Sequence, residues 1–356
     1  MDVEYEIWII NRDTYTRVTM IESMVKLRYS QKLNTYGSCM LIVDADYVKV
    51  PDLAQQAALV VYRNGVERFS GIINRTHYQA DTSAPSGETW TVEGQDRTSY
   101  LKWTLIPCIG IDSENRSGPA DDVMKDYVRY HAGSLAGTRA RSDVVVAANA
   151  SAAPTYPAEA RNIYLLTLLQ NIADGAGVWF RIEPNSAAGT QTFTTAYPLW
   201  GMDRSRGNGI NPELVLSFDR RNFEELFFTD DRLDLCNAVY VGGGGEGAER
   251  NIRLRTDADS ITANLRREKF HEDRNSTHDA TLNAHGDAFL VANGPRVWMT
   301  GVPREDLWPG SYDLGDKVTV TINRGSLAET HDIIITGLTV TVEKMVETVA
   351  PEMIES

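Results

Sequence analysis

The sequence predicts a mainly β chain with an α+β insertion, and three observations lead to this fold class. Short stretches toward both ends alternate apolar and polar residues with period two, as half-buried strands do. Between them, apolar residues recur at helical spacing, and a glycine-rich hairpin lies near residue 240. At 356 residues, the chain is long enough for two or more domains, each with its own core.

The first hundred residues are predicted to form an antiparallel barrel or sandwich. Strands are expected over 3–9, from the turn Asn11-Arg12-Asp13 to Met20, and over 24–29, 39–43, 57–62, 66–73 and 89–92. Asn64-Gly65 separates two of these runs and is the strongest short-range signal for a β-hairpin. After the last run, Asp96 can cap a short helix that carries Tyr100, Leu101 and Trp103.

The middle of the chain is predicted to be a small α+β unit. Ser117-Gly118-Pro119 is expected to start a helix that carries Val123, Met124, Tyr127, Val128 and His131, with His131 in its last turn. Residues 144–157 are rich in Ala, Ser and Pro and are interpreted as a linker or surface loop. Asn162 is expected to cap an apolar helix over 163–173, which strands follow over 178–182, 191–195 and 214–217.

A strand over 223–228 precedes the stretch 235–253, which is predicted to be a strand, a glycine loop and a second strand. Gly242, Gly244 and Gly247 match the dinucleotide-binding spacing G-x-G-x-x-G, but that motif works only where the loop opens a helix. Here the residues that follow alternate with period two, and Glu246 and Glu249 would repel a phosphate. We therefore expect a β-hairpin whose glycines permit positive φ or a close backbone approach, with a solvated acidic tip.

The rest of the chain is predicted to be two helices and a run of strands. A short helix is expected near 257–263 and an amphipathic one over 277–292, before strands over 297–301, 317–322, 331–335, 338–342 and 346–354. Segments 60–73 and 320–339 share the order strand, polar turn, strand, glycine, strand, with Gly71 matched to Gly337. Chance similarity of two hairpins and internal duplication stay open as explanations. In either case, each glycine interrupts a strand where a bulge or a close approach is expected.

These elements divide the chain into three expected domains. They are a first β-barrel domain over 1–105, an α+β insertion over 106–217 with the loop 144–157, and a second β-barrel domain over 218–356 with the helix near 277–292. A true duplication would give each chain two similar antiparallel, tube-like β-barrels.

Composition excludes several classes of function. The formal net charge of −14 argues against a surface that coats nucleic acid, which needs basic patches. Cys39, Cys108 and Cys236 are far apart, which indicates reduced thiols rather than a disulfide framework or a zinc site. We find no signal peptide and no apolar run that approaches a membrane span. The expected place of synthesis is a reducing cytoplasm.

No combination of residues predicts an active site, a metal site or a cofactor site. His271, His278 and His285 do not have metal-ligand spacing, and His278 and His285 are interpreted as solvated. The acidic pairs Asp121-Asp122, Asp230-Asp231 and Glu246 with Glu249 are the ordinary residues of turns and helix starts. There is no nucleophile elbow and no catalytic cysteine signature. We therefore predict that the chain is not an enzyme.

The order of elements resembles the tail-hub family of tailed phages, which includes the tail-associated hub of siphophages and the central hub of contractile-tail baseplates. The residues that carry the resemblance are Phe69-Ser70-Gly71-Ile72, Glu93-Gly94-Gln95-Asp96, Asn237-Ala238-Val239-Tyr240-Val241 with Gly245-Glu246-Gly247, Arg266-Arg267-Glu268 and Leu314-Gly315-Asp316. The resemblance covers most of the chain, although its motifs are structural and loose.

The resemblance implies a structural virion protein of the tail tip, assembled in the host cytoplasm. Three copies would form a ring whose two barrels per chain present six similar faces to a hexameric tail tube. The expected partners are two further copies, the distal tail protein or the tail tube, and other tail-tip proteins. DNA would pass an acidic lumen without specific binding. The interface candidates are Gly71, Gly337, Gly242, Gly244, Gly247 and Glu246.

Two alternatives from other classes stay open. A cell-wall hydrolase would need a cleft with convergent carboxylates. A glycan-binding protein of the host-recognition apparatus would expose aromatic side chains on the loops near Trp200 or Trp308. Because the chain ends at Ser356, soon after the last predicted strands, we expect any wall-cutting extension to belong to another polypeptide.

Overall fold

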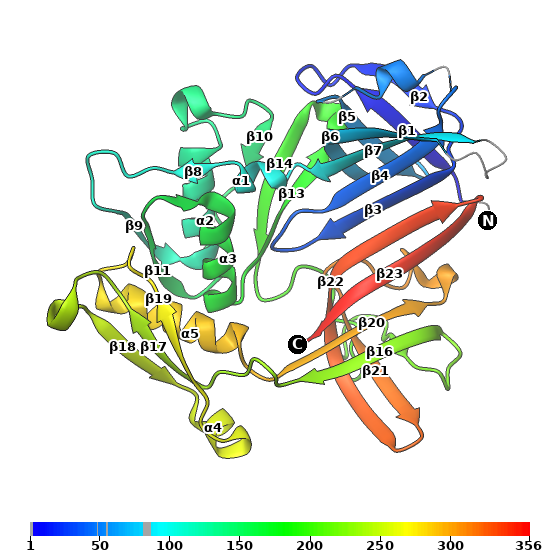
Figure 1. The fold of residues 1–356 in the computed structure, drawn as a ribbon. Helices are drawn as coiled ribbons and strands as arrows, with labels where there is room; N and C mark the ends of the chain where they lie inside the picture. Colours follow the sequence, from blue (N-terminus) through cyan, green and yellow to red (C-terminus); the bar gives the residue numbers. More distant parts are fainter. Residues whose placement is uncertain (1–2, 48, 55, 81–86) are drawn as a thin grey trace.

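A computed structural model describes residues 3–47, 49–54, 56–80 and 87–356. Most of its strands join one large sheet, in which neighbours run in the order β16-β20-β23-β22-β3-β4-β7-β6-β5-β1-β2, with β21 beside β22 and β15 beside β21. Figure 1 shows the N-terminal strands in blue and the C-terminal strands in orange and red, lying side by side. The two ends of the chain therefore share one sheet.

The bounds of most of these strands lie close to the predicted runs, but β6 and β22 extend well beyond theirs. The N-terminal set is β1 (Tyr5–Ile10), β2 (Arg17–Ile21), β3 (Lys26–Lys32), β4 (Ser38–Asp44), β5 (Ala58–Arg63), β6 (Val66–Ala80) and β7 (Glu88–Asp96). The C-terminal set is β15 (Val215–Leu216), β16 (Phe223–Asp231), β20 (Arg296–Pro303), β21 (Lys317–Arg324), β22 (Leu327–Glu343) and β23 (Val346–Glu355). At the predicted hairpin, Asn64 and Gly65 both have positive φ between β5 and β6.

The long strand β22 connects the two sets. Its first half pairs with β21, and its second half pairs with β3 instead, while β23 lies along its other edge. A strand of 17 residues can serve two neighbours in succession, so the prediction of two separate strands over 331–335 and 338–342 is wrong. One hydrophobic core, from Ile7 to Met353, fills the space beneath both sets.

The mainly β class with inserted α/β elements is confirmed, but we find no closed barrel among the described strands. The sheet path has open ends at β2 and β16, each with one neighbour in the described structure. Because β3 pairs with β22, the two sets continue into each other rather than closing separately.

The first insertion lies between β7 and β15. It contains the helices α1 (Ser99–Lys102), α2 (Ala120–His131) and α3 (Leu165–Ala176), and the strands β8 (Leu105–Ile106), β9 (Glu114–Pro119), β10 (Val144–Val146), β11 (Thr155–Ala160), β12 (Ile163–Tyr164), β13 (Trp179–Asn185) and β14 (Thr190–Ala196). Its own core gathers apolar side chains of α2, α3, β13 and β14.

The helix predicted after Ser117-Gly118-Pro119 is confirmed as α2, with Pro119 at its N-cap and His131 in its last turn, although these three residues themselves end the strand β9 and pair with β11. Two other predictions in this insertion are wrong. The supposed linker 144–157 contains β10 and the beginning of β11. Asn162 does not cap α3, because its side chain accepts a hydrogen bond from the N–H of Cys108 at 3.1 Å, and Tyr164 occupies the N-cap position.

A second insertion separates β16 from β20. It comprises β17 (Ala238–Gly242), β18 (Ile252–Thr256), α4 (Ala258–Asn264), β19 (Glu268–Glu272) and α5 (Asp279–Ala292). The predicted hairpin is confirmed as β17 and β18, whereas β19, parallel to β17, was not predicted. The helix α5 packs on this small sheet and against α3, as Figure 1 shows at the lower left. No helix in the described part of the chain is long and apolar enough to cross a membrane.

Candidate assembly interface

The large sheet contains the same five-stranded unit twice. In the first unit, the strands lie in the order β3-β4-β7-β6-β5, and in the second, they lie in the order β16-β20-β23-β22-β21. Both orders arise from the same succession along the chain, and every neighbouring pair is antiparallel. The second unit differs by the insertion between its first two strands. The topology therefore favours internal duplication over chance similarity.

A bulge in each long strand fixes which residues correspond. The ladder of β6 with β7 shifts between Ile73 and Arg75, and that of β22 with β23 shifts between Ile335 and Gly337. Each strand also stops pairing with its hairpin partner just before this point. Ile73 and Ile335 are therefore equivalent, and so are Arg75 and Gly337.

Backbone hydrogen bonds confirm this equivalence. The N–H of Ile73 donates to the carbonyl of Ala57 at 2.9 Å, and the carbonyl of Ile73 accepts from Gln56 at 2.8 Å. In the second unit, the N–H of Ile335 donates to the carbonyl of Asp316 at 3.0 Å. The carbonyl of Ile335 accepts from the N–H of Gly315 at 2.7 Å. Two independent features thus give one register, in which the expected match of Gly71 with Gly337 is wrong by four residues.

Gly71 and Gly337 have different surroundings. A Cβ on Gly71 would lie 2.6 Å from the carbonyl oxygen of Gln95, in the neighbouring strand β7. A Cβ on Gly337 would lie 3.0 Å from the end of the flexible Glu352 side chain. The close backbone approach expected at Gly71 is thus present, whereas Gly337 borders the bulge where β22 exchanges β21 for β3.

The two units meet along the ladder of β3 with β22. Seven residues of β3 pair with residues 337–343 of β22 in antiparallel register. On one face of this junction, Lys26 pairs with Glu343 at 2.8 Å, and Lys32 pairs with Glu352 at 2.8 Å. The same face carries Arg75 and Glu93, 3.4 Å apart. Most of the charges named on this face, which we call the paired-charge face, thus form ion pairs.

The opposite face of the junction is fastened by a buried ion pair. The Arg63 guanidinium of β5 donates two hydrogen bonds of 2.8 Å to the Glu347 carboxylate of β23. Tyr5 adds a third hydrogen bond to Glu347, and the Trp308 ring covers Arg63 at 4.7 Å. Both charged side chains are 8% exposed. The hydrogen bonds to Glu347 raise the pKa of Arg63, so the guanidinium stays charged.

A groove of about 850 Å³ opens on the paired-charge face of the first unit. Arg28, Met40 and Glu93 lie side by side across β3, β4 and β7 on its floor, and Trp103 of the first insertion forms a wall. One cation, one anion and an apolar side chain share this floor without converging carboxylates. Glu93 is thus the one carboxylate among the described residues that line the groove.

The glycine hairpin does not hold a phosphate. Only a three-residue 3₁₀ turn, Gly247–Glu249, follows the loop before β18, so the loop does not open an α-helix as the dinucleotide-binding motif requires. A Cβ on Gly242 would collide with Phe270 and Arg250, whereas Gly247 has positive φ and open space around it. Gly244 lies against Thr277, and Glu246 is exposed at the tip. The glycines thus supply close packing and a turn.

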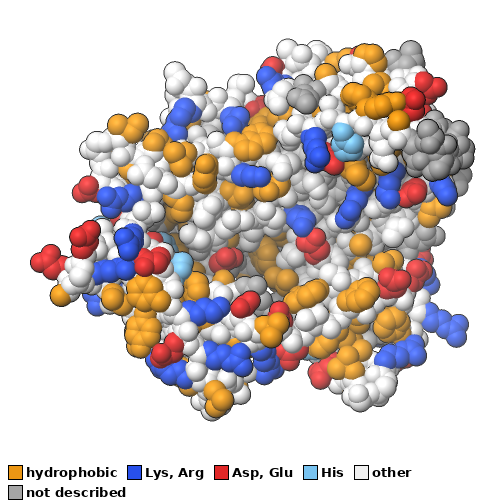
Figure 2. Space-filling model, in the orientation of Figure 1, with side chains coloured by type: hydrophobic (Ala, Val, Ile, Leu, Met, Phe, Trp, Pro, Cys, Tyr) orange, Lys and Arg blue, Asp and Glu red, His pale blue; other side chains and the backbone are white. Residues whose placement is uncertain are grey.

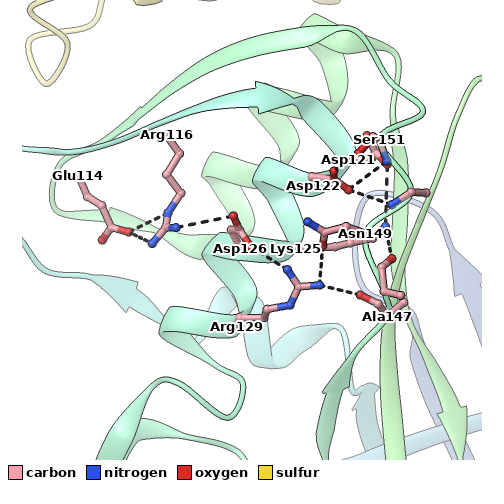
Figure 3. Close-up of polar contacts among 12 residues, drawn as sticks. Glu114, Arg116, Asp121, Asp122, Lys125, Asp126, Arg129, Ala147, Asn149 and Ser151 are labelled. Carbon is pink, nitrogen blue, oxygen red and sulfur yellow. Dashed lines mark hydrogen bonds and ion pairs between the residues drawn. The ribbon is translucent and has the colours of Figure 1, made fainter.

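The adjacent carboxylates of α2 hold a loop in place. Figure 3 shows Asp121 and Asp122 facing the segment around Ser151. Asp122 accepts hydrogen bonds from the backbone N–H of Ala150 at 3.0 Å and from the Ser151 hydroxyl at 2.7 Å. Burial raises the pKa of Asp122, but these hydrogen bonds outweigh it and leave the pKa below its usual value. Asp121 accepts from Ala153 in the same way, at 3.1 Å. Both carboxylates thus fasten the segment 150–153 to α2.

The candidate histidines do not form a metal site in the described part of the chain, where no group of metal-binding residues gathers. His285 is buried rather than solvated, with Nδ1 2.5 Å from the Asp273 carboxylate. Burial lowers the pKa of His271, whose ring lies 4.7 Å from that of Phe289 in a tilted arrangement. Burial also raises the pKa of the Cys39 thiol to about 12. These groups belong to the packing of their domains.

The aromatic residues proposed for glycan binding are not free loop residues. Trp308 is buried under Arg63 and Arg68, and its indole N–H donates to Asp313 at 3.2 Å. Trp200 packs against the main core, close to Gly315. Both side chains support the sheet, because the loops fold back onto it.

Comparison with known proteins agrees with this architecture. A tail protein from Neisseria meningitidis MC58 superimposes with a TM-score of 0.60 at 18% identity, covering 99% of this chain and 96% of that one. The 43 kDa tail protein of prophage MuSo2 from Shewanella oneidensis gives 0.61 at 12% identity, covering 99% and 98%. Prophage tail protein gp18 from Listeria monocytogenes EGD-e gives 0.56 at 11% identity, covering 98% and 94%.

These structures share the fold of this chain over nearly its whole length. No match was found among curated protein sequences. A family model, described as Siphovirus ReqiPepy6 Gp37-like protein, matches residues 5–353. The resemblance to tailed-phage proteins is therefore confirmed, and the chain belongs to the Siphovirus ReqiPepy6 Gp37-like family.

Proposed function

We propose that this protein is a structural hub subunit of the phage tail tip, three copies of which form a ring that continues the tail tube. The observation that carries the proposal is the repeated five-stranded unit. A tube of six-fold symmetry needs six similar surfaces, and three chains with two units each supply six. The duplication thus matches a six-fold tube to a three-fold tip.

The junction between units indicates how such a ring would be built. Within one chain, the two units are joined edge to edge by β3 and β22, so their paired-charge faces continue into one surface. Six units joined in this manner would curve this surface around a central channel. Its ion pairs and the net charge of −14 would let DNA pass without adhering, because no continuous basic surface is offered to the phosphates.

The proposed role is non-enzymatic, and its partners are the distal tail protein or tail tube on one side and tip proteins on the other. In support, the described acidic pairs are engaged in local hydrogen bonds or stand exposed at turns. A turbidity assay on purified cell walls tests the hydrolase alternative directly. We expect no loss of turbidity, and lysis by the pure chain would overturn the structural role.

Native mass spectrometry of the protein, alone and with its tube-side neighbour, tests the ring. Each chain weighs 39.6 kDa, so 3 × 39.6 kDa gives a ring of about 119 kDa. We expect three copies of the chain in the complex, about 119 kDa in addition to the mass of the neighbour, since the ring can require its partner to close. A closed dimer, or a monomer that stays monomeric on the neighbour, contradicts the proposal.

A further inference from the structure

We infer that the free edge of β16 in one copy pairs, antiparallel, with residues 75–80 of β6 in the next copy. This inference rests on the proposed ring and assigns the residues that would close it. In the described structure, β16 pairs with β20 alone, and β6 beyond Ile73 pairs with β7 alone. Unpaired strand edges are templates for a further strand, so both edges need an occupant or a cover.

The internal repeat indicates that a second copy of this chain pairs with each free strand edge. The counterparts of the two free edges are β3 and the second half of β22, and these pair with each other within the chain. In the second unit, β16 occupies the place of β3, and its outer edge is unpaired, whereas that of β3 is paired. In the first unit, β6 occupies the place of β22, and the edge of its second half is unpaired, whereas that of β22 is paired. Copying the internal junction between chains satisfies both edges.

The register of this seam follows from the ladders. Met299 lies opposite Phe228 and Met353, and its counterpart Cys39 lies opposite Tyr29 and Gly94. Phe228 is thus the counterpart of Tyr29. Inside the chain, Tyr29 pairs with Val340, three residues beyond Gly337.

Because Arg75 is the counterpart of Gly337, the counterpart of Val340 is Tyr78. The seam therefore places Phe228 of one copy opposite Tyr78 of the next. Tyr29 and Val340 are fully buried at the internal junction, whereas Tyr78 is 50% exposed in the single chain. An aromatic pair across the seam would bury it.

At one end of the seam, the charges of the two strands are complementary. In this register Asp231 faces Arg75, which is 70% exposed and whose ion pair among the described residues, with Glu93, is 3.4 Å long. An anion and a cation opposite each other stabilise a ladder, whereas like charges destabilise it. Phe227, 64% exposed, faces Gln79. Figure 2 shows hydrophobic side chains gathered over the region where Figure 1 places β16 and β20, next to this edge.

Cysteine cross-linking tests the register. In a chain carrying Phe228→Cys, Tyr78→Cys and Cys108→Ser, oxidation of the assembled ring should join three chains into one covalent species on a non-reducing gel. Directly opposite Cβ atoms are about 4.5–5.5 Å apart, within reach of a disulfide, whereas positions two residues along are not. The matched control therefore carries Phe228→Cys with Thr76→Cys, and it should remain uncross-linked.

A charge variant tests the seam without introducing cysteines. Asp231→Arg should weaken ring formation about tenfold or more, since it sets two arginines face to face. Glu249→Arg makes the same change of charge at the exposed hairpin tip and should leave the ring intact. If native mass spectrometry shows the ring but Phe228→Cys with Tyr78→Cys does not cross-link, or Asp231→Arg assembles as well as Glu249→Arg, the seam is wrong while the hub function stands. If the unmodified chain forms no ring with its neighbour, both are wrong.

Discussion

Replacing Glu347 by Gln should destabilise the protein far more than the same replacement at the exposed Glu352 does. Glu347 accepts two hydrogen bonds of 2.8 Å from Arg63 and a third from Tyr5, and both members of the ion pair are 8% exposed. Removing one charge from a buried pair leaves the other uncompensated, which costs roughly 3 kcal/mol. Because the pair joins β5 to β23, the loss should also loosen the contact between the two units.

Glu352→Gln is the matched control. It makes the same chemical change in the same strand, and Glu352 also pairs with a cation, Lys32, at 2.8 Å. Its side chain is 45% exposed, so the expected cost is at most about 1 kcal/mol.

Urea unfolding followed by tryptophan fluorescence measures both variants, and the midpoint with its slope gives the free energy of unfolding. A double variant, Arg63→Met with Glu347→Leu, should be more stable than Glu347→Gln, because no buried charge is left unpaired. Equal losses for Glu347→Gln and Glu352→Gln would refute the reasoning.

Three further predictions concern other parts of the chain. Gly71→Val should leave little soluble assembled protein, because its Cβ would meet the backbone of β7 at 2.6 Å. Gly337→Val should assemble with a smaller defect, since the flexible end of the Glu352 side chain can move. Size-exclusion chromatography measures both variants, and a larger defect for Gly337→Val would contradict this prediction. Glu246→Gln with Glu249→Gln should change the free energy of unfolding by less than about 0.5 kcal/mol, and a larger change would show that the tip is not solvated. Hydrogen bonding to His131 lowers the pKa of Glu114 to about 2, so the stabilisation that ionised Glu114 contributes is complete above pH 4.5 and is lost as the pH falls toward 2. Glu114→Gln should therefore make the free energy of unfolding less dependent on pH over that range. An unchanged pH profile of the free energy of unfolding would contradict this prediction.

Sequence patterns predicted the strands of the main sheet because its faces differ in polarity, so alternation marks each strand. The Asn64-Gly65 turn was predicted for a local reason, since both residues tolerate positive φ. The short helix near Asp257 was predicted from equally local features, and in α4 the Asp257 side chain accepts a hydrogen bond from the Ser260 N–H at 2.9 Å. Such signals depend on neighbours in sequence.

Features that depend on distant contacts were missed. β19 has charged and aromatic residues on both faces and becomes a strand only because β17 lies beside it. The bulges at Asn74 and Thr336 set the true register of the repeat, but neither residue type marks a bulge. The conspicuous glycines at 71 and 337 suggested a different alignment. The two similar hairpins could therefore be recognised in the sequence, but the register of the repeat could not.

An end-on projection image of isolated tail tips tests the central claim most directly. The proposed hub predicts a ring of three-fold symmetry that contains six lobes of similar size, because each chain contributes the same five-stranded unit twice. A low-resolution class average is sufficient to count them. A ring of a different symmetry, or a tail tip in which this chain forms no ring, would contradict the account.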